Sequence, residues 1–347
     1  MYTQVLSDDW TKTLHLQADR SVELHNQASA FYRTRIPKAG RALGYHYPSC
    51  DALVGGLGGH VFRLNLEQGR FLNPFALQGN PEESSDATFD QDEDAVVGVN
   101  AIDVNPAHHL LSFGTEVNSG KGTVEFWDQR VRRRVGILSL PYNKLASSTS
   151  SASAQLPGLS LLDPDNKTLT SAQLGVTALA SRSDGLNLAV GTSTGHTLLY
   201  DLRSPTPYTI KDQGYGLPIK KIQWPTTHTD SSDGPLVASA DNKIVKIWHS
   251  SPSASGKNFV AINPPSSIND MHVYPESGLV FLANEQSAVT SYYIPALGMA
   301  PKWCRFLDHM TEEMEDDQKT STLYEDYKFV DRTELASFVP SPFFVLY

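Results

Sequence analysis

The stretch LAVGTSTGHTLLYD, residues 188–201, contains two short apolar runs joined by a polar turn that includes Gly195. The first run ends near small residues, and the second ends in an aromatic residue followed by an acid. Two hairpin strands typically produce this pattern, because apolar and polar side chains then point to opposite faces. The stretch LSFGTEVNSGKGTVEFWD, residues 111–128, repeats the arrangement and ends in Trp127-Asp128. An ending of this kind is typical of WD repeats, which indicates a fold built from repeated hairpins.

Four weaker copies of the same unit extend the repeat along the chain. The polar residues that end the six units are separated by 39, 63, 73, 48 and 44 positions, and they lie at 26, 65, 128, 201, 249 and 293. Three of these intervals are close to the WD40 period of about 40 to 45 residues. The two long intervals contain an acidic segment at about 81–97 and a Ser-rich segment at about 147–173, whose compositions are typical of loops. The sequence therefore predicts an all-β, WD40-like β-propeller over residues 1–307.

Six units predict six four-stranded blades, and the apolar start at Thr3–Leu6 already reads as a first strand. We therefore expect a seven-bladed ring from which one N-terminal blade is absent in this sequence. After residue 307 the composition becomes acidic and then mixed, which predicts an acidic linker and an extended C-terminal tail over residues 308–347. A solenoid of helical repeats is disfavoured, because the units alternate with period two.

The formal net charge of −10 is unevenly distributed along the chain. Residues 82–94 contain seven acids and residues 312–317 contain five, with no Lys or Arg in either run. Removing those twelve from the 38 acidic residues leaves 26 against 28 basic residues, so net charge excludes neither RNA nor protein partners.

The sequence contains no run of 18 apolar residues and no secretory signal. Its two cysteines, Cys50 and Cys304, are predicted to be buried thiols without disulfides.

Motifs that would carry chemistry are weak in this sequence. The run Gly55–Gly59 lacks the Lys-Ser/Thr ending of a phosphate loop and is better explained as a tight turn between strands. The pair His108-His109 is not accompanied by a zinc-ligand pattern, and no GxSxG motif is present. We predict no catalytic residues, no cofactor, no metal, no membrane partner and no small-molecule substrate.

Two basic clusters are the candidate contact residues. Arginine offers planar, bidentate donors to phosphate, and four aromatic residues near the first cluster (Phe31, Tyr32, Tyr45 and Tyr47) could stack on unpaired bases. Each cluster follows a third or fourth strand, so we expect both near one rim. The alternative is that they are solvated strand edges protected by charge. The predicted RNA or partner contacts are Arg33, Arg35, Lys38, Arg41, Arg130, Arg132, Arg133 and Arg134.

Other basic and aromatic residues are predicted to be structural. Four lysines form a weaker set that we expect to alternate outward along strands: Lys220, Lys221, Lys243 and Lys246. Three tryptophans in predicted strands are expected to pack between blades: Trp127, Trp224 and Trp248.

Several longer segments, taken together, are far more specific than a WD dipeptide. They are FYRTRIPKAGR (31–41), YHYPSCD (45–51), VFRLNLEQGRFLNP (61–74), VGTSTGHTLLYDLRS (190–204), YGLPIKKI (215–222), SADNKIVKIW (239–248), YPESG (274–278), YYIPALGMAPKWC (292–304) and YEDYKFV (324–330). These segments, in this order, resemble those of the nucleolar protein 10 family, also called essential nuclear protein 2.

That resemblance implies a seven-bladed propeller and a nucleolar scaffold for small-subunit ribosome assembly, within the particle organised around U3 small nucleolar RNA. The partners it implies are other assembly factors, with pre-ribosomal or U3 RNA as a further contact. It also implies a first blade and a charged C-terminal extension that this sequence lacks. Two other classes stay open: a WD40 adaptor for peptides, for example in a ubiquitin ligase, and a propeller enzyme with its active site at the central channel.

Overall fold

The computed structural model describes residues 2–6, 11–77, 96–117, 122–131, 133–141, 145, 174–226, 234–251, 257–311 and 314. Within these ranges the chain forms antiparallel sheets connected in sequence order. The predicted acidic loop lies outside the described residues except for 96–97, which begin a strand, and the Ser-rich segment at 147–173 lies wholly outside them.

Six sheets follow one another along the described chain, and the first five have four strands each. The first sheet contains β1 (Tyr2–Val5), β2 (Thr13–Leu16), β3 (Ser21–His25) and β4 (Ala30–Arg35). The second contains β5 (Gly40–His46), β6 (Asp51–Gly56), β7 (His60–Asn65) and β8 (Arg70–Ala76), with the short 3-10 helix η1 (Tyr47–Ser49) after β5. The third contains β9 (Val96–Val104), β10 (Leu111–Val117), β11 (Thr123–Asp128) and β12 (Arg133–Ser139).

The remaining sheets repeat the same order of strands. The fourth contains β13 (Val176–Ser181), β14 (Asn187–Thr192), β15 (His196–Asp201) and β16 (Thr209–Asp212). The fifth contains β17 (Lys221–Gln223), β18 (Leu236–Ala240), β19 (Val245–His249) and β20 (Asn258–Ile262). The sixth contains β21 (Ile268–Val273), β22 (Leu279–Asn284) and β23 (Thr290–Tyr293). The predicted hairpin units correspond to the second and third strands of each sheet.

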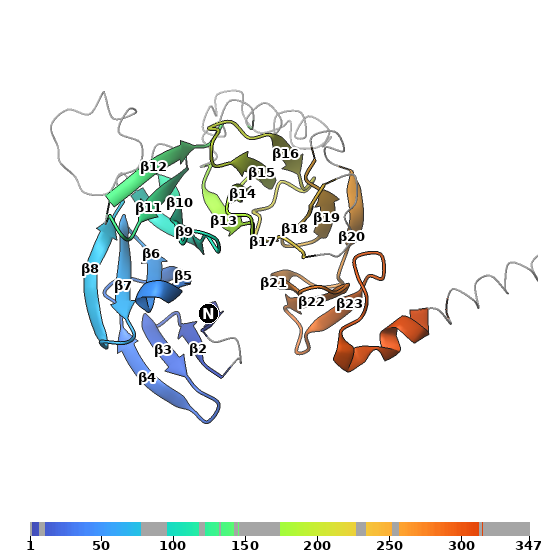
Figure 1. Cartoon of the computed structure of the whole chain (residues 1–347), viewed down its shortest axis with the longest axis horizontal. Helices are drawn as coiled ribbons and strands as arrows, with labels where there is room; N and C mark the ends of the chain where they lie inside the picture. Colours follow the sequence, from blue (N-terminus) through green and yellow to red (C-terminus); the bar gives the residue numbers. More distant parts are fainter. Residues whose placement is uncertain are drawn as a thin grey trace, which may run out of the picture.

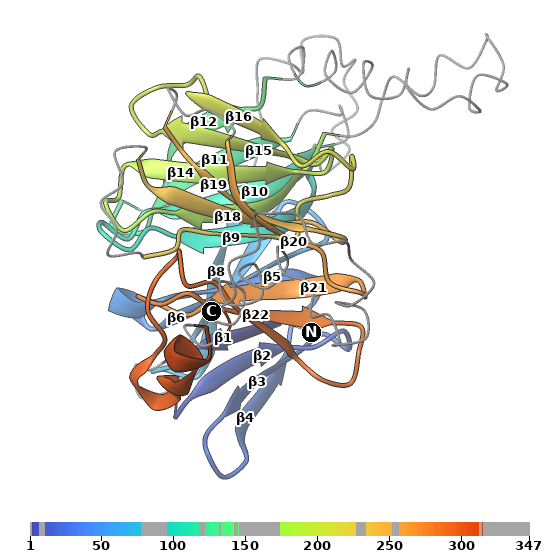
Figure 2. The ribbon, with the colours of Figure 1, turned by 90° about the vertical axis from the view of Figure 1, so that its right-hand side faces the viewer.

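The sheets pack face to face around a common centre, as Figure 1 shows. The first strands β1, β5, β9, β13, β17 and β21 lie innermost, and the successive first strands contact one another. The ribbons of the first and sixth sheets end the arc and lie apart in the same view. Figure 2 shows the arrangement edge-on as a thick disc. The predicted β-propeller is confirmed with six sheets, and the seventh blade stays a prediction.

Five apolar layers hold the disc together, one between each pair of neighbouring sheets. Between the first and second sheets, for example, Leu14 and Leu16 pack against Val54 and Leu64. Between the fourth and fifth sheets, the fully buried Trp248 packs with Leu199. Because alternate side chains on a strand point to opposite faces, each inner sheet supplies apolar residues to two layers. Removal of this surface from water is the main stabilising contribution to the fold.

The predicted structural residues occupy the expected places. Trp224 and Trp127 pack beside the layers of buried residues, in agreement with the predicted packing of tryptophans between blades. The Gly55–Gly59 run spans the end of β6 and the turn into β7, where Gly58 has a φ of 84° that favours glycine. Cys304 is buried as predicted, whereas Cys50 is partly exposed.

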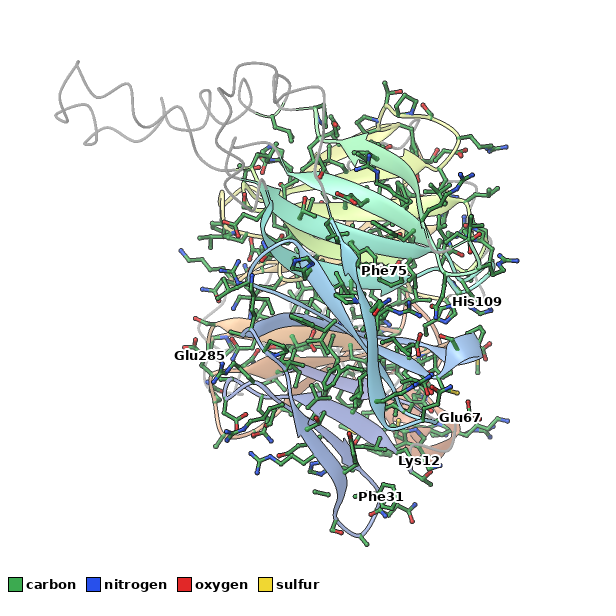
Figure 3. All side chains as sticks on the ribbon, turned by 90° about the vertical axis from the view of Figure 1, so that its left-hand side faces the viewer. Lys12, Phe31, Glu67, Phe75, His109 and Glu285 are labelled. Atoms are coloured by element: carbon green, nitrogen blue, oxygen red, sulfur yellow. The ribbon has the colours of Figure 1, made fainter. Side chains whose placement is uncertain are left out.

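The disc has two faces that differ in which connections they carry. Face I carries the turns between first and second strands and between third and fourth strands; Face II carries the turns between second and third strands and the connections between sheets. Figure 3 shows this separation: Lys12, Glu67 and His109 lie on one side, and Glu285, in the β22–β23 turn, lies on the other.

The segment after β23 packs against the disc before it leaves the described structure. The 3-10 helix η4 (Lys302–Cys304) is followed by helical residues 306–311, which lie on the Face I side in Figure 2. The Tyr293 hydroxyl group donates a hydrogen bond to Asp308, and the backbone N–H of Ala300 donates to the same carboxylate at 3.0 Å. These hydrogen bonds hold the pKa of Asp308 below its ordinary value. The predicted linker boundary at residue 308 therefore falls inside an anchored helical segment.

Candidate interaction surfaces

Arg33 of the first predicted basic cluster is neutralised within its own sheet. Its Nη2 lies 2.9 Å from Asp19 Oδ2, and its Nε lies 3.0 Å from Glu23 Oε1. Glu23 is 7% exposed and also pairs with His25 and accepts a hydrogen bond from Gln17. A positive charge held between two carboxylates contributes little free charge to a phosphate-binding surface.

The other members of this cluster are spread from the rim to the channel. Arg35 ends the outer strand β4 and is exposed, whereas Lys38 lies in the connection to the second sheet. Arg41, on the innermost strand β5, donates from Nη1 to Glu116 Oε2 at 2.9 Å and to Asn100 Oδ1 at 3.1 Å. The predicted cluster is therefore a radial line of charges and not a compact patch.

The aromatic residues that flank this cluster also separate. Phe31 is 75% exposed on β4, whereas Tyr32 packs against the layer between the first and second sheets. Tyr45 and Tyr47 contact each other, with ring centroids 4.9 Å apart, at the Face I end of β5. They cannot form one stacking platform with Arg35 and Arg41, which lie toward Face II.

The second predicted cluster lies at the Face I end of the third sheet. Arg130 is in the β11–β12 turn, where its backbone N–H donates to Asp128 Oδ1 at 2.8 Å and its Nη2 to His108 O at 3.4 Å. Arg134 Nη1 lies 4.0 Å from Glu125 Oε1, a fully buried carboxylate. Arg133 is exposed at the start of β12, and the predicted contact Arg132 lies outside the described residues.

The prediction that both clusters lie near one rim is wrong. Arg130 lies in a turn after a third strand, on Face I, whereas Lys38 follows a fourth strand, on Face II. The hydrogen bond from Arg20, in the β2–β3 turn, to Pro37 O confirms the Face II position of this connection. The error has a simple physical cause: an antiparallel strand begins at one face and ends at the other, so the turns before and after it are on opposite sides.

A buried arginine that the sequence did not single out lies between the second and third sheets. Arg63 Nη2 donates to Asp51 Oδ2 at 2.7 Å, and its guanidinium carbon lies 4.6 Å from the Phe75 ring centroid. Burial would raise the pKa of Asp51, but hydrogen bonds from Arg63 and Asn65 hold it below its ordinary value. A rim groove opens beside Arg63, with Arg70 and Trp127 also in its walls. In the sequence, Arg63 is a charged residue that alternates with apolar residues along β7. The pattern therefore gives no sign that its side chain is buried and does not point outward.

Charged residues of several first strands line the channel. Asp103 accepts a hydrogen bond from Ser181 N–H at 2.8 Å, and burial raises the pKa of this carboxyl group. The Face II mouth is lined by Arg41, Lys220 and Lys221 together with Asn100 and Asn269. In the part of the chain that the structure describes, no group of three or more His, Cys, Asp or Glu side chains is placed to hold a metal ion.

No helix in the described ranges is long and apolar enough to span a membrane. The fold and these surfaces define a β-propeller that carries ion-paired basic residues on both faces.

Comparison with known proteins identifies the family. Residues 1–318 match the model of the N-terminal domain of Nucleolar protein 10-like proteins. The chain belongs to this family, which confirms the resemblance seen in the sequence. A search of solved structures finds a chain of the "Crystal Structure of Mitotic Checkpoint Complex" with a TM-score of 0.56 and 19% identity, covering 83% of this chain and 72% of that chain. At that identity the likeness shows the fold alone.

Named relatives from yeasts and vertebrates are similar over nearly the whole chain. The "Ribosome biogenesis protein enp2 homolog" of Schizosaccharomyces pombe is 46% identical over 96% of this chain and 46% of that protein. "Nucleolar protein 10" of Homo sapiens is 41% identical over 99% of this chain and 43% of that protein. "Ribosome biogenesis protein ENP2" of Saccharomyces cerevisiae is 40% identical over 95% of this chain and 39% of that protein. The chain spans less than half the length of these relatives. The name Nucleolar protein 10, which the vertebrate relatives carry, confirms the predicted nucleolar location.

Proposed function

We propose that this chain is a non-catalytic scaffold in ribosome biogenesis, acting in the small-subunit processome during pre-rRNA processing. The observation that carries the proposal is family membership over nearly the whole chain, together with relatives named as ribosome biogenesis proteins. A propeller suits this role because its two faces and rim present separate surfaces to several partners. The partners proposed are other small-subunit assembly factors and, through basic side chains, pre-rRNA or U3 RNA.

Among the predicted contact residues, Arg35 and Arg133 are the best supported. Both are exposed, and neither makes an ion pair with the described residues. Arg33, Arg41, Arg130 and Arg134 already lie beside carboxylates, so a partner would have to compete for them. Lys38 and Arg132 complete the proposed set.

The proposal is tested by affinity purification of the tagged full-length protein from cell extract, with a high-salt wash. We expect small-subunit precursors and U3 RNA to co-purify. A matched purification of the Trp248→Ala variant controls for non-specific capture, because this substitution removes a side chain from the apolar layer between the fourth and fifth sheets. Recovery of ubiquitin-ligase subunits, or of no ribosomal component, would contradict the scaffold and favour the peptide-adaptor alternative.

A further inference from the structure

The connection from β16 to β17, residues 213–220, displays an aromatic side chain on Face II. Tyr215 is 50% exposed and lies between two glycines with positive φ, Gly214 at 93° and Gly216 at 63°. Residues with a Cβ rarely adopt this conformation, so both glycines are needed for the path of the chain around Tyr215. Half of the Tyr215 side chain is therefore open to solvent in a turn whose backbone path the two glycines permit.

Both ends of this connection are firmly attached, so the exposure of Tyr215 does not reflect a loose loop. The Gln213 side chain donates to Ser239 O at 3.1 Å and Ile244 O at 3.2 Å, and it is fully buried. At the other end, the Ile219 N–H donates to Thr192 O at 3.1 Å. The connection is therefore fixed to both the fourth and fifth sheets, and Tyr215 is held outward between these anchors.

Two lysines of the β18–β19 hairpin, Lys243 and Lys246, and one of β16, Lys211, belong to the segments next to this connection. Lys243 Nζ lies 5.5 Å from the Tyr215 ring centroid, in cation–π range. Lys246 Nζ donates to Gln213 O at 2.7 Å. Burial, followed by the charge of Lys246, lowers the pKa of Lys211. We call Lys211, Tyr215, Lys243 and Lys246 the lysine–tyrosine patch.

The acids next to the patch are already engaged with the backbone. Asp212 Oδ1 accepts the Gly214 N–H at 2.8 Å, although its charge partly offsets that of Lys246 at Lys211. Asp241 is fully buried and accepts the N–H groups of Lys243 and Ile244 at 2.6 and 2.7 Å. By formal charge, the three lysines exceed these two carboxylates by one. The lysines that were predicted to alternate outward along strands instead contact this connection, Lys243 at the Tyr215 ring and Lys246 at Gln213 O.

We propose that the lysine–tyrosine patch binds single-stranded RNA, with an unpaired base stacked on Tyr215 and phosphates contacted by Lys211, Lys243 and Lys246. A polyanion relieves the mutual repulsion of neighbouring lysines, and an aromatic ring beside cations is the arrangement by which proteins bind single strands without sequence preference. The choice of RNA over an acidic peptide rests on the proposed function in ribosome assembly and on the exposed ring, which an acidic peptide would leave unused.

The test measures binding of fluorescein-labelled oligouridine to the full chain by fluorescence anisotropy. We expect Tyr215→Ala to weaken binding about tenfold, the effect of losing one stacked base. Replacing Lys211, Lys243 and Lys246 together by Gln should reduce the slope of log Kd against log salt by about 2, since each phosphate contact in a single strand contributes about 0.7. Circular dichroism checks folding, and replacement of the three lysines by Arg should retain binding.

Matched controls come from Face I. Trp303, which contacts Tyr274 after β21, is 63% exposed, and Lys257 is an exposed lysine before β20. Trp303→Ala and Lys257→Gln should leave oligouridine binding unchanged. Equal affinities for patch and control variants would overturn the proposal. So would polyglutamate binding that matches oligouridine and is insensitive to Tyr215→Ala, because the patch would then serve an acidic protein.

This outcome is separable from that of the purification experiment. If the full-length protein fails to recover pre-ribosomes but binds oligouridine through Tyr215, the scaffold proposal fails and the RNA-binding patch stands. If wild type and Tyr215→Ala recover pre-ribosomes equally, and substitutions in the lysine–tyrosine patch leave oligouridine affinity unchanged, only the patch proposal fails.

Discussion

The arginines near β4 and the lysines near Tyr215 are two basic regions that differ in how closely their residues lie in the sequence and in how they are paired in space. The arginines are close in sequence, within residues 33–41, yet Arg33 is neutralised by Asp19 and Glu23, and Arg41 by Glu116. The lysines are spread from 211 to 246, yet Lys243 makes a cation–π contact with the exposed Tyr215 ring and Lys246 donates to Gln213 O in the same connection. Density of charge along a sequence is therefore a poor guide to charge on a propeller surface. What matters is which strands end side by side.

The largest effect we expect comes from removing the side chain that packs beneath the lysine–tyrosine patch. Trp248 is fully buried in the layer between the fourth and fifth sheets, and its Nε1 donates to Ser239 Oγ at 3.2 Å. Trp248→Ala should lower the free energy of unfolding by about 3–5 kcal/mol through lost packing and a residual cavity. Urea unfolding measures this change.

The matched control for that prediction is Trp303→Ala, because Trp303 is 63% exposed. A surface substitution of this kind should change the free energy of unfolding by roughly 0.5 kcal/mol or less. Similar losses for the two tryptophans would show that the layer between the sheets does not stabilise the fold as the structure indicates.

An intermediate effect is expected from releasing Arg33. Glu23→Gln removes the charge of a buried carboxylate that pairs with Arg33 and His25. We expect the free energy of unfolding to fall by roughly 1–2 kcal/mol, since charge-assisted hydrogen bonds are replaced by weaker ones. Oligouridine affinity should rise slightly, because Arg33 then lies beside one carboxylate, Asp19, and no longer beside two.

Glu67→Gln provides the comparison, because Glu67 is exposed in the β7–β8 turn. It changes net charge by the same amount but leaves Arg33 paired. If both glutamate variants raise RNA affinity equally, the gain reflects net charge alone and the difference between the two basic regions is not one of local pairing.

The smallest effect concerns the titration of Lys211. Lys246→Gln removes a like charge, so the pKa of Lys211 should move up toward its ordinary value of 10.5. A lysine whose folded-state pKa is lowered costs stability while it is charged. That cost disappears as pH rises from the lowered pKa of the folded state toward the ordinary pKa of the unfolded state. The free energy of unfolding should therefore increase with alkaline pH, and it should increase more for the wild type than for the variant. NMR titration of Lys211 measures the shift directly.

Lys257→Gln is the control for this titration, because Lys257 lies before β20, away from the β16 strand that carries Lys211. The pKa of Lys211 should not change in that variant. If Lys246→Gln leaves the pKa of Lys211 unchanged, burial alone lowers that pKa. The inference that repulsion by Lys246 contributes to the shift would then be wrong.

The predictability of this molecule from sequence differs between its fold and its surfaces. The hairpin units ending at Asp128 and Asp201 identify β11 and β15 with the strand ends as observed. The tryptophan predicted to pack between blades, Trp248, is fully buried. By contrast, neither Arg63 under the rim groove nor Tyr215 in the Face II patch carried any local signal. Their importance comes from residues on other sheets.

The sequence by itself predicted a β-propeller, because strand alternation and turn residues act over a few positions. Its longer segments separately carried the resemblance to the Nucleolar protein 10-like family. Only the tertiary structure decided where charge is available. It placed Lys38 and Arg130 on opposite faces of the disc, paired Arg33 with Asp19 and Glu23, and brought Lys243 to Tyr215. The physical reason is that electrostatic interactions depend on distance in space, and packing of sheets around a ring brings together residues far apart in the chain.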